Sequence, residues 1–108
     1  MGTFIVTKND DGHYFIKLKG KNGKVILNSM RYLSKSVCKN EIETIRAIAT
    51  DNLKYEYRKT FDGKFYFRLK SVLGEVLGHS NLFDSAELRD LEIEMVRKIA
   101  PIATVCGY

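Results

Sequence analysis

The segment DGHYFIKLKGKNGKVILNS, residues 11–29, is the most informative part of the sequence for the fold, because it occurs twice. Residues 62–80 read DGKFYFRLKSVLGEVLGHS, and the correspondence continues without a gap into EIETIRAIA and EIEMVRKIA. Between residues 8–49 and 59–100, 15 of 42 positions are identical, whereas unrelated chains match at about two or three. The chain is therefore a tandem repeat.

A repeat of this length is too short to bury its own apolar face, so the two copies should complete one core. The 108 residues include 44% hydrophobic and 29% charged residues, a composition typical of one globular domain. We expect a single domain, 1–108, made of repeats at about 1–51 and 52–102 and a closing strand at about 103–108. Internal pseudo-twofold symmetry follows.

Alternation of apolar and polar residues predicts three strands in each repeat. The pairs Asp11-Gly12, Asp62-Gly63 and Asn22-Gly23 are typical of tight turns between strands. Leu73-Gly74 is a poorer turn sequence, so we expect that connection to be longer or of another type. The predicted strands cover residues 3–8, 14–19, 25–28, 53–59, 65–70 and 76–79.

After each third strand the apolar period changes to about 3.6 residues, which predicts an amphipathic helix. Ser34 and Ser85 stand where a hydroxyl would cap the first amides of each helix, and Pro101 ends the second helix. Lys39, Glu43 and Arg46 should face solvent. The predicted apolar stripes are Val37, Cys38, Ile42, Ile45 and Ala49 in the first helix and Leu88, Ile93, Val96 and Ala100 in the second.

The resulting order is βββα, βββα, β. It predicts an α+β domain with one mainly antiparallel sheet and both helices on one face. The closing segment ATVCGY follows the second helix as the strand at 53–59 follows the first, and we expect it to pair with the first copy's strands. The predicted core comprises Phe4, Val6, Tyr14, Ile16, Leu18, Val37, Ile42, Ile45, Tyr55, Phe65, Phe67, Leu69, Leu88, Ile93, Val96 and Ile99.

These motifs resemble the YegP-like family of small bacterial proteins of unknown function over about residues 4–108. The sequence departs from the family pattern at Leu73, which replaces a turn Asn, and at Glu41 and Glu92, which replace a Gly. The resemblance implies one sheet with helices on one face and exchanged C-terminal strands, and it implies no activity. The matching positions are Gly12, Phe15, Leu18, Lys19, Asn22, Gly23, Ile26, Ser29, Tyr32 and Ile42, and in the second copy Gly63, Leu69, Lys70, Gly74, Leu77, Ser80, Phe83 and Ile93.

Metal and redox chemistry find little support in the sequence. Cys38 and Cys106 lack CxxC spacing, and a zinc site using His13 and His79 would need ligands from separate elements. We expect Cys38 to be a small core residue and Cys106 a packed or edge thiol. No metal site, cofactor or disulfide is predicted.

Catalytic arrangements are also missing. His79 and Ser80 are adjacent on a strand and should point to opposite faces, so they cannot form a dyad. Ser80 matches Ser29 in the other copy, which favours a structural hydroxyl bonded to backbone amides. The paired glutamates at 41 and 43, repeated at 92 and 94, are typical of a solvated helix face, and GKNGK at residues 20–24 lacks the length of a phosphate loop. We expect no enzyme.

The N-terminal sequence shows no export signal, and no apolar run approaches the ~20 residues of a membrane helix. We therefore expect a cytoplasmic protein without membrane partners. A monomer should suffice for folding, although a homodimer through an exposed sheet edge stays open. The net charge of +5 favours contact with polyanions without identifying one.

Two hypotheses for the function follow. The first is a small non-enzymatic interaction module that binds a protein partner through a sheet edge. The alternative is weak, nonspecific binding of RNA or single-stranded DNA on the helix-free sheet face, where basic and aromatic residues should alternate. Solvated lysines and arginines that merely keep an open sheet soluble would give the same pattern. The predicted nucleic-acid face comprises Phe15, Lys17, Lys19, Lys54, Arg58, Tyr66, Arg68 and Lys70.

Overall fold

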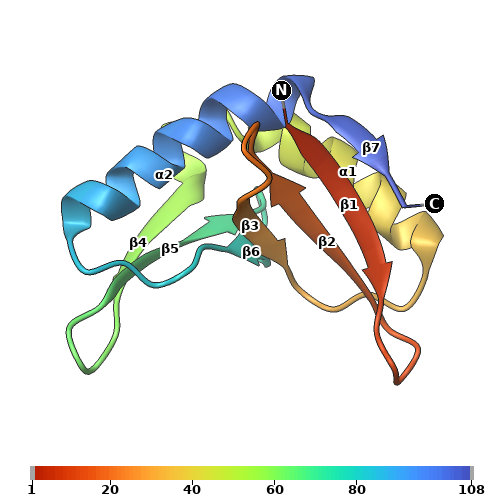
Figure 1. Cartoon of the computed structure of the whole chain (residues 1–108), viewed down its shortest axis with the longest axis horizontal. Helices are drawn as coiled ribbons and strands as arrows, with labels where there is room; N and C mark the ends of the chain where they lie inside the picture. The colour runs from red at the N-terminus through yellow and green to blue at the C-terminus, as the bar shows by residue number, and fades with distance from the viewer. Residues whose placement is uncertain (1, 108) are drawn as a thin grey trace.

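Figure 1 shows the computed structural model of the chain, of which residues 2–107 are described. Seven strands form one sheet in the order β4-β5-β6-β3-β2-β1-β7, so the predicted α+β fold of two βββα repeats is confirmed. The elements are β1 (Thr3–Lys8), β2 (Tyr14–Lys19), β3 (Val25–Ser29), α1 (Lys35–Ile48), η1 (Asn52–Lys54), β4 (Tyr55–Lys59), β5 (Phe65–Lys70), β6 (Val76–His79), α2 (Ala86–Ile99), η2 (Ala100–Ile102) and β7 (Thr104–Cys106).

The two repeats join at the middle of the sheet, where β3 and β6 pair antiparallel through Asn28 with His79 and Ser29 with Gly78. The other pairs are antiparallel as well, except that β7 runs parallel to β1. The prediction that the last strand pairs with the first copy is thus confirmed. Tyr108, the final residue of the predicted strand, lies outside the described residues.

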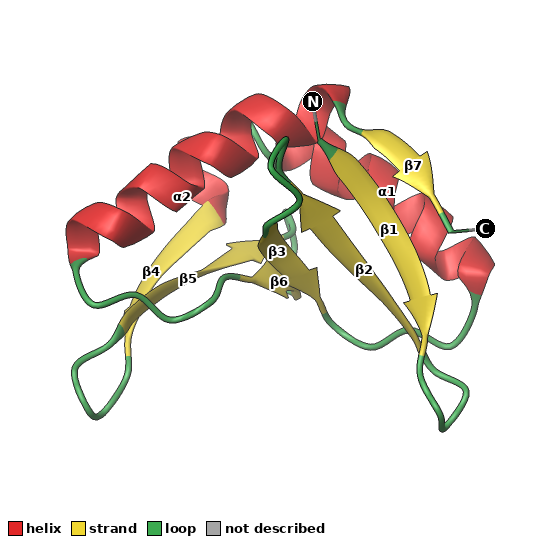
Figure 2. Ribbon diagram, viewed as in Figure 1, coloured by secondary structure: helices red, strands yellow, loops and turns green. Residues whose placement is uncertain are grey.

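Both helices lie on the same side of the sheet (Figure 2). The hairpin turns that follow β1 and β4 project on the opposite side, and the sheet bends so that its concave side faces away from the helices (Figure 1). The predicted caps are confirmed, since the Val37 amide donates to Ser34 Oγ at 3.2 Å and the Leu88 amide to Ser85 Oγ at 3.1 Å. No helix within residues 2–107 is long and apolar enough to cross a membrane.

The core lies between the helices and the sheet, and most of the predicted core is buried. Val37 and Leu88 are the exceptions, with exposed fractions of 40% and 47%. In each helix the side chain that turns toward the core belongs to the following residue, which is Cys38 in α1 and Arg89 in α2. Because neighbouring helix residues are about 100° apart, an error of one residue turns a side chain out of the core. Tyr14, Phe65 and Ile99 are half-buried at its margin.

The expectation of a different turn between β5 and β6 is wrong. Gly74 adopts φ 86° and Gly23 in the first copy adopts φ 80°, so both turns use glycine in the left-handed region. The Lys24 amide donates to Asn22 Oδ1 at 3.1 Å. In the second copy Ser71 Oγ accepts from the Glu75 amide at 3.2 Å, so a serine supplies the acceptor that Leu73 lacks.

Glu92 and Arg46 were predicted to face solvent, but Glu92 is buried and Arg46 is half-buried. Glu92 on α2 is only 8% exposed, and desolvation by burial raises its pKa. Arg46 on α1 lies over the Phe4 ring, 5.6 Å from its centroid, and donates a hydrogen bond to the Ala103 carbonyl just before β7. Both side chains are held at the edge of the core, where the helix packs against elements distant in sequence.

Candidate binding face

The pairing registers place one residue from every strand in a single row across the sheet. Ile16 and Leu18 of β2 are buried toward the helices, so Lys17 between them faces the other way. We call the helix-free side the open face. Its central row, from β7 to β4, is Cys106, Ile5, Lys17, Asn28, His79, Arg68 and Glu56.

Two adjoining hollows, of about 550 and 410 Å³, lie on the open face beside the pseudo-twofold axis. Met30 and His79 line both hollows, which we call together the central groove. Phe15 and Tyr66, at equivalent positions of the two repeats, add one aromatic ring to each. The remaining lining residues are Ser29 and Arg31 in the first hollow and Arg68 and Val76 in the second.

The cations of the second repeat gather around one carboxylate. Glu56 lies 3.2 Å from Lys70 Nζ, 3.7 Å from Arg68 and 3.9 Å from Arg58. The hydrogen bond from Lys70 is the main reason why the pKa of Glu56 is lowered. Tyr66 lies between two guanidinium groups, because Arg58 bonds its hydroxyl and Arg68 lies 5.9 Å from its ring centroid.

The first repeat has no such acid, because Ile5 occupies the position that matches Glu56. Lys17 and Lys19 lie there on β2, and Arg31 follows β3. Within residues 2–107 none of these three has an ion-pair partner. The open face is therefore asymmetric in charge: the cations are unpaired in one half and shared by Glu56 in the other.

The structure brings seven of the eight predicted face residues onto the strands of the open face. Lys54 is the exception, because the chain forms the 3-10 helix η1 there instead of extending β4, and Lys54 pairs with Asp51 at 3.6 Å. Met30, Arg31, Asn28 and His79 were not predicted from the sequence to lie on this face. The register between β3 and β6 brings Asn28 and His79 together, and no local pattern encodes that register.

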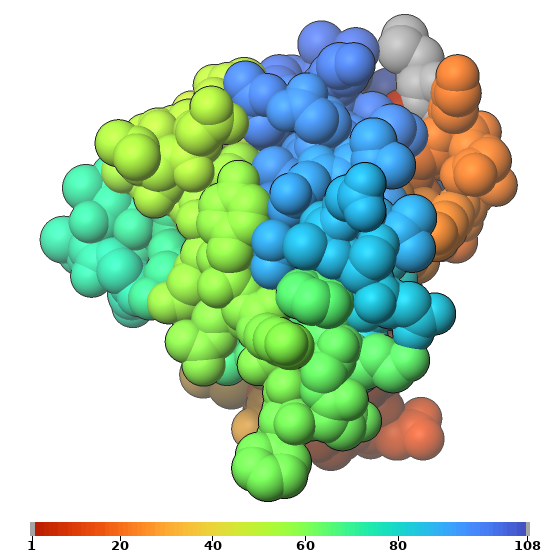
Figure 3. Space-filling view, turned by 90° about the vertical axis from the view of Figure 1, so that its left-hand side faces the viewer, coloured from red at the N-terminus to blue at the C-terminus, as the bar shows by residue number. Residues whose placement is uncertain are grey.

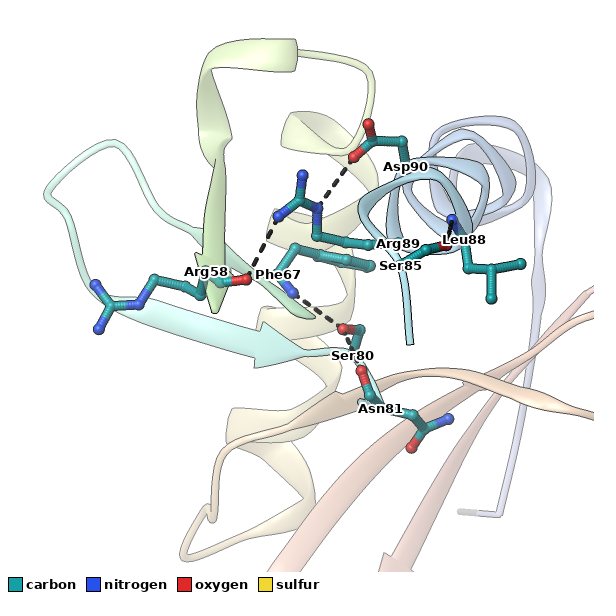
Figure 4. Close-up of polar contacts among 8 residues, drawn as sticks. All are labelled: Arg58, Phe67, Ser80, Asn81, Ser85, Leu88, Arg89 and Asp90. Atoms are coloured by element: carbon teal, nitrogen blue, oxygen red, sulfur yellow. Dashed lines mark hydrogen bonds and ion pairs between the residues drawn. The ribbon is translucent and has the colours of Figure 1, made fainter. Parts of the chain in front are cut away.

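Ser80 bonds to backbone groups (Figure 4), and it lies on the opposite face of the strand from its neighbour His79. His79 is exposed on the open face, whereas Ser80 is buried. Ser80 Oγ accepts from the Phe67 amide at 3.0 Å and donates to the Asn81 carbonyl at 2.8 Å. Ser29 repeats these contacts with the Ile16 amide at 2.7 Å and the Met30 carbonyl at 2.8 Å. Both hydroxyls thus complete the hydrogen bonding where the strands separate.

The two cysteines lie in different surroundings. Cys38 is buried under the sheet, and burial raises the pKa of its thiol, whereas Cys106 is exposed on the short strand β7. Both are free thiols. In the part of the chain that the structure describes, no three His, Cys, Asp or Glu side chains cluster in a way that could hold a metal ion.

This duplicated βββα architecture defines a class of small two-repeat proteins. Residues 9–56 and 62–106 each match the domain of unknown function DUF1508. The UPF0339 protein in the ptx operon 5' region of Stutzerimonas stutzeri is 38% identical over 104 residues, 96% of this chain and 94% of that protein. UPF0339 protein YegP of Escherichia coli K12 is 32% identical over the same shares of the two chains.

Solved structures agree with the fold. The solution NMR structure of YegP from E. coli has a TM-score of 0.93 at 31% identity, covering 98% of this chain and 91% of that one. The solution NMR structure of UPF0339 protein SO3888 from Shewanella oneidensis has a TM-score of 0.92 at 28% identity, covering 98% and 90%. The chain therefore belongs to the DUF1508 (UPF0339) family, whose function is unknown.

Proposed function

We propose that the protein is a non-enzymatic binding module that holds single-stranded nucleic acid weakly, and without sequence preference, on its open face. The observation that carries this proposal is the central groove, which combines one aromatic ring from each repeat with cations on both sides. Aromatic rings stack on any base, and cations follow the phosphates, which is the general pattern of sequence-tolerant single-strand binding.

The arrangement of the groups supports this ligand class. Phe15 lines one hollow and Tyr66 the other, and Met30 and His79 line both. A single strand that crosses the sheet would place bases against the two rings and phosphates beside Lys17 and Arg68. Within a flat, open groove such contacts supply modest affinity, about 1 to 3 kcal/mol for each stacked base.

The chemistry of the groove favours binding over catalysis. His79 is the only imidazole among its lining residues, and the Ser80 hydroxyl next to it is engaged with backbone groups. Activation of a nucleophile needs a base within hydrogen-bond reach that a third group orients. The described residues of the groove do not provide that geometry.

Fluorescence anisotropy with a labelled oligothymidine of about ten nucleotides tests the proposal. We expect binding at low salt whose log affinity falls linearly with log salt concentration. The double variant Lys17→Glu with Arg68→Glu should lose at least about tenfold in affinity, because two phosphate contacts become repulsive.

The matched control is Lys35→Glu with Lys98→Glu, which makes the same change in net charge on the exposed helix side. It should weaken binding far less than the open-face variant. Equal loss in both variants would show a delocalised charge effect, and no binding at low salt would refute the proposal.

A further inference from the structure

The outer edge of β4 carries free backbone groups. Phe65 exchanges both of its backbone hydrogen bonds with Phe83, and Phe67 bonds Ser80. Alternate residues of a strand bond to opposite sides, so β5 reaches β4 through Tyr66 and Arg68. The backbone N–H and C=O of Tyr57 therefore point outward, and no group within residues 2–107 bonds them. Figure 3 shows β4 at the surface beside α2.

The other half of the molecule shows what fits such an edge. β1 is the counterpart of β4, and β7 adds to its outer edge as a parallel strand through Thr3 with Thr104, Phe4 with Val105 and Ile5 with Cys106. Val6 on the covered edge is 5% exposed, whereas its counterpart Tyr57 on the uncovered edge is 54% exposed. The β4 edge repeats the β1 edge only in part, because η1 replaces the start of the strand and the Tyr55 N–H donates to the Asn52 carbonyl. The vacant part of the edge begins at Tyr57.

The arginine that bonds the chain next to β7 has a counterpart in the second repeat. On α1, Arg46 donates to Glu43 at 2.8 Å and to the carbonyl of Ala103, the residue before β7. On α2, Arg97 donates to Glu94 at 2.5 Å, which repeats the helical pair. Among the described residues no strand carbonyl accepts from Arg97. The second helix therefore holds the same donor at an edge where the strand is missing.

The downstream end of β4 is basic. Arg58 and Lys59 are exposed there, and Arg89 lies over the Tyr57 ring, 4.8 Å from its centroid. Arg89 also donates to the Arg58 carbonyl at 3.4 Å and to Asp90 at 3.0 Å (Figure 4). These cations disfavour pairing with another basic strand edge. They favour a strand that carries acidic residues beside Lys59.

We infer that the outer edge of β4 binds an extended segment of a partner protein as an added parallel strand, with small and β-branched residues beside Tyr55–Lys59 and acidic residues at its downstream end. Backbone hydrogen bonds supply the affinity of this kind of recognition, and the flanking charges select the partner. A second copy of this chain is a poor occupant. Its net charge is +5, and moving its β7 to another molecule would uncover its own β1 edge.

The test uses the full chain labelled with ¹⁵N and two acetylated peptides, Ala-Thr-Val-Thr-Gly-Glu-Glu and the same sequence ending in Lys-Lys. The common part copies the segment around β7 with Thr for Cys. We expect amide shifts confined to β4 and the first turns of α2, and the acidic peptide should bind at least about fivefold more tightly. Lys59→Glu should reverse the preference between the two peptides.

Tyr57→Pro removes the outward donor without touching a bond to β5, and proline is tolerated on edge strands. It should abolish binding while the amide spectrum of the other strands is retained. The inference is overturned if neither peptide shifts any amide at millimolar concentration. Shifts at β1, which would mean that the peptide displaces β7, or shifts confined to the open face would overturn it as well.

Discussion

At the scale of single residues, Glu56 sets the charge balance of the open face. Its carboxylate forms ion pairs with three cations, Arg58, Arg68 and Lys70. We predict that Glu56→Gln strengthens oligothymidine binding about two- to fivefold, because those cations become available to phosphates. Anisotropy at two salt concentrations measures this, with Glu75→Gln in an exposed turn as the control. Weaker binding by the Glu56 variant would contradict the proposed face.

The same carboxylate predicts the pH dependence. Because the pKa of Glu56 is lowered, chiefly by the Lys70 hydrogen bond, its contribution to folding is present above the ordinary carboxyl pKa and is lost as the pH falls through the folded pKa. The group therefore stays ionised between about pH 5 and 7. We expect it to cause no change in oligonucleotide affinity across that window, which anisotropy as a function of pH would check in Glu56→Gln and the natural sequence.

The pKa of Glu92 is shifted in the opposite direction from that of Glu56. Burial raises its pKa, and its Oε2 has no hydrogen-bond partner, so the ionised form costs stability near neutral pH. Glu92→Gln should raise the free energy of unfolding at pH 7 by about 1 kcal/mol. The gain should shrink as the pH falls toward 4.5, the ordinary value. Urea denaturation at both pH values tests this, and a gain that does not depend on pH would contradict it.

At the scale of elements, β7 stabilises the first half by covering β1. Val105 packs against the core, whereas its neighbour Cys106 is exposed. We predict that Val105→Asp lowers the free energy of unfolding by about 2 kcal/mol, while Cys106→Asp changes it by about 0.5 kcal/mol or less. Urea denaturation of the two variants provides the comparison. Equal losses in the two variants would contradict the inward packing of Val105.

At the scale of the whole molecule, neither repeat can close its own core. β3 meets β6 at the centre of the sheet, and β7 from the end of the chain covers β1. We predict that residues 2–51 alone do not form a folded monomer, whereas the full chain is a monomer over a range of concentrations. Circular dichroism of the half and light scattering of the whole measure this. A folded monomeric half would contradict the shared core.

The repeat, the order of the elements, most turns and both helix caps could be predicted from the amino-acid sequence. Each of these depends on residues a few positions apart, as in Ser34 with the Val37 amide, and local hydrogen bonds and alternation are visible in a linear pattern. The resemblance to the YegP-like family came from the same local motifs. It carried no function, because the pattern that it matches describes the scaffold.

The way in which these elements meet could not be predicted from the sequence, because it depends on long-range contacts. Contacts between distant segments set the rotation of each helix, which buries Cys38 and places Arg89 over Tyr57. Such contacts also bury Glu92 and gather the cations around Glu56. The central groove depends on the register of Asn28 with His79, residues 51 positions apart. The free edge of β4 follows from the connectivity of the chain. The strand after α1 is β4, which begins the second repeat, whereas the strand after α2 is β7, which covers the edge of β1. No further strand follows within the described residues to cover β4.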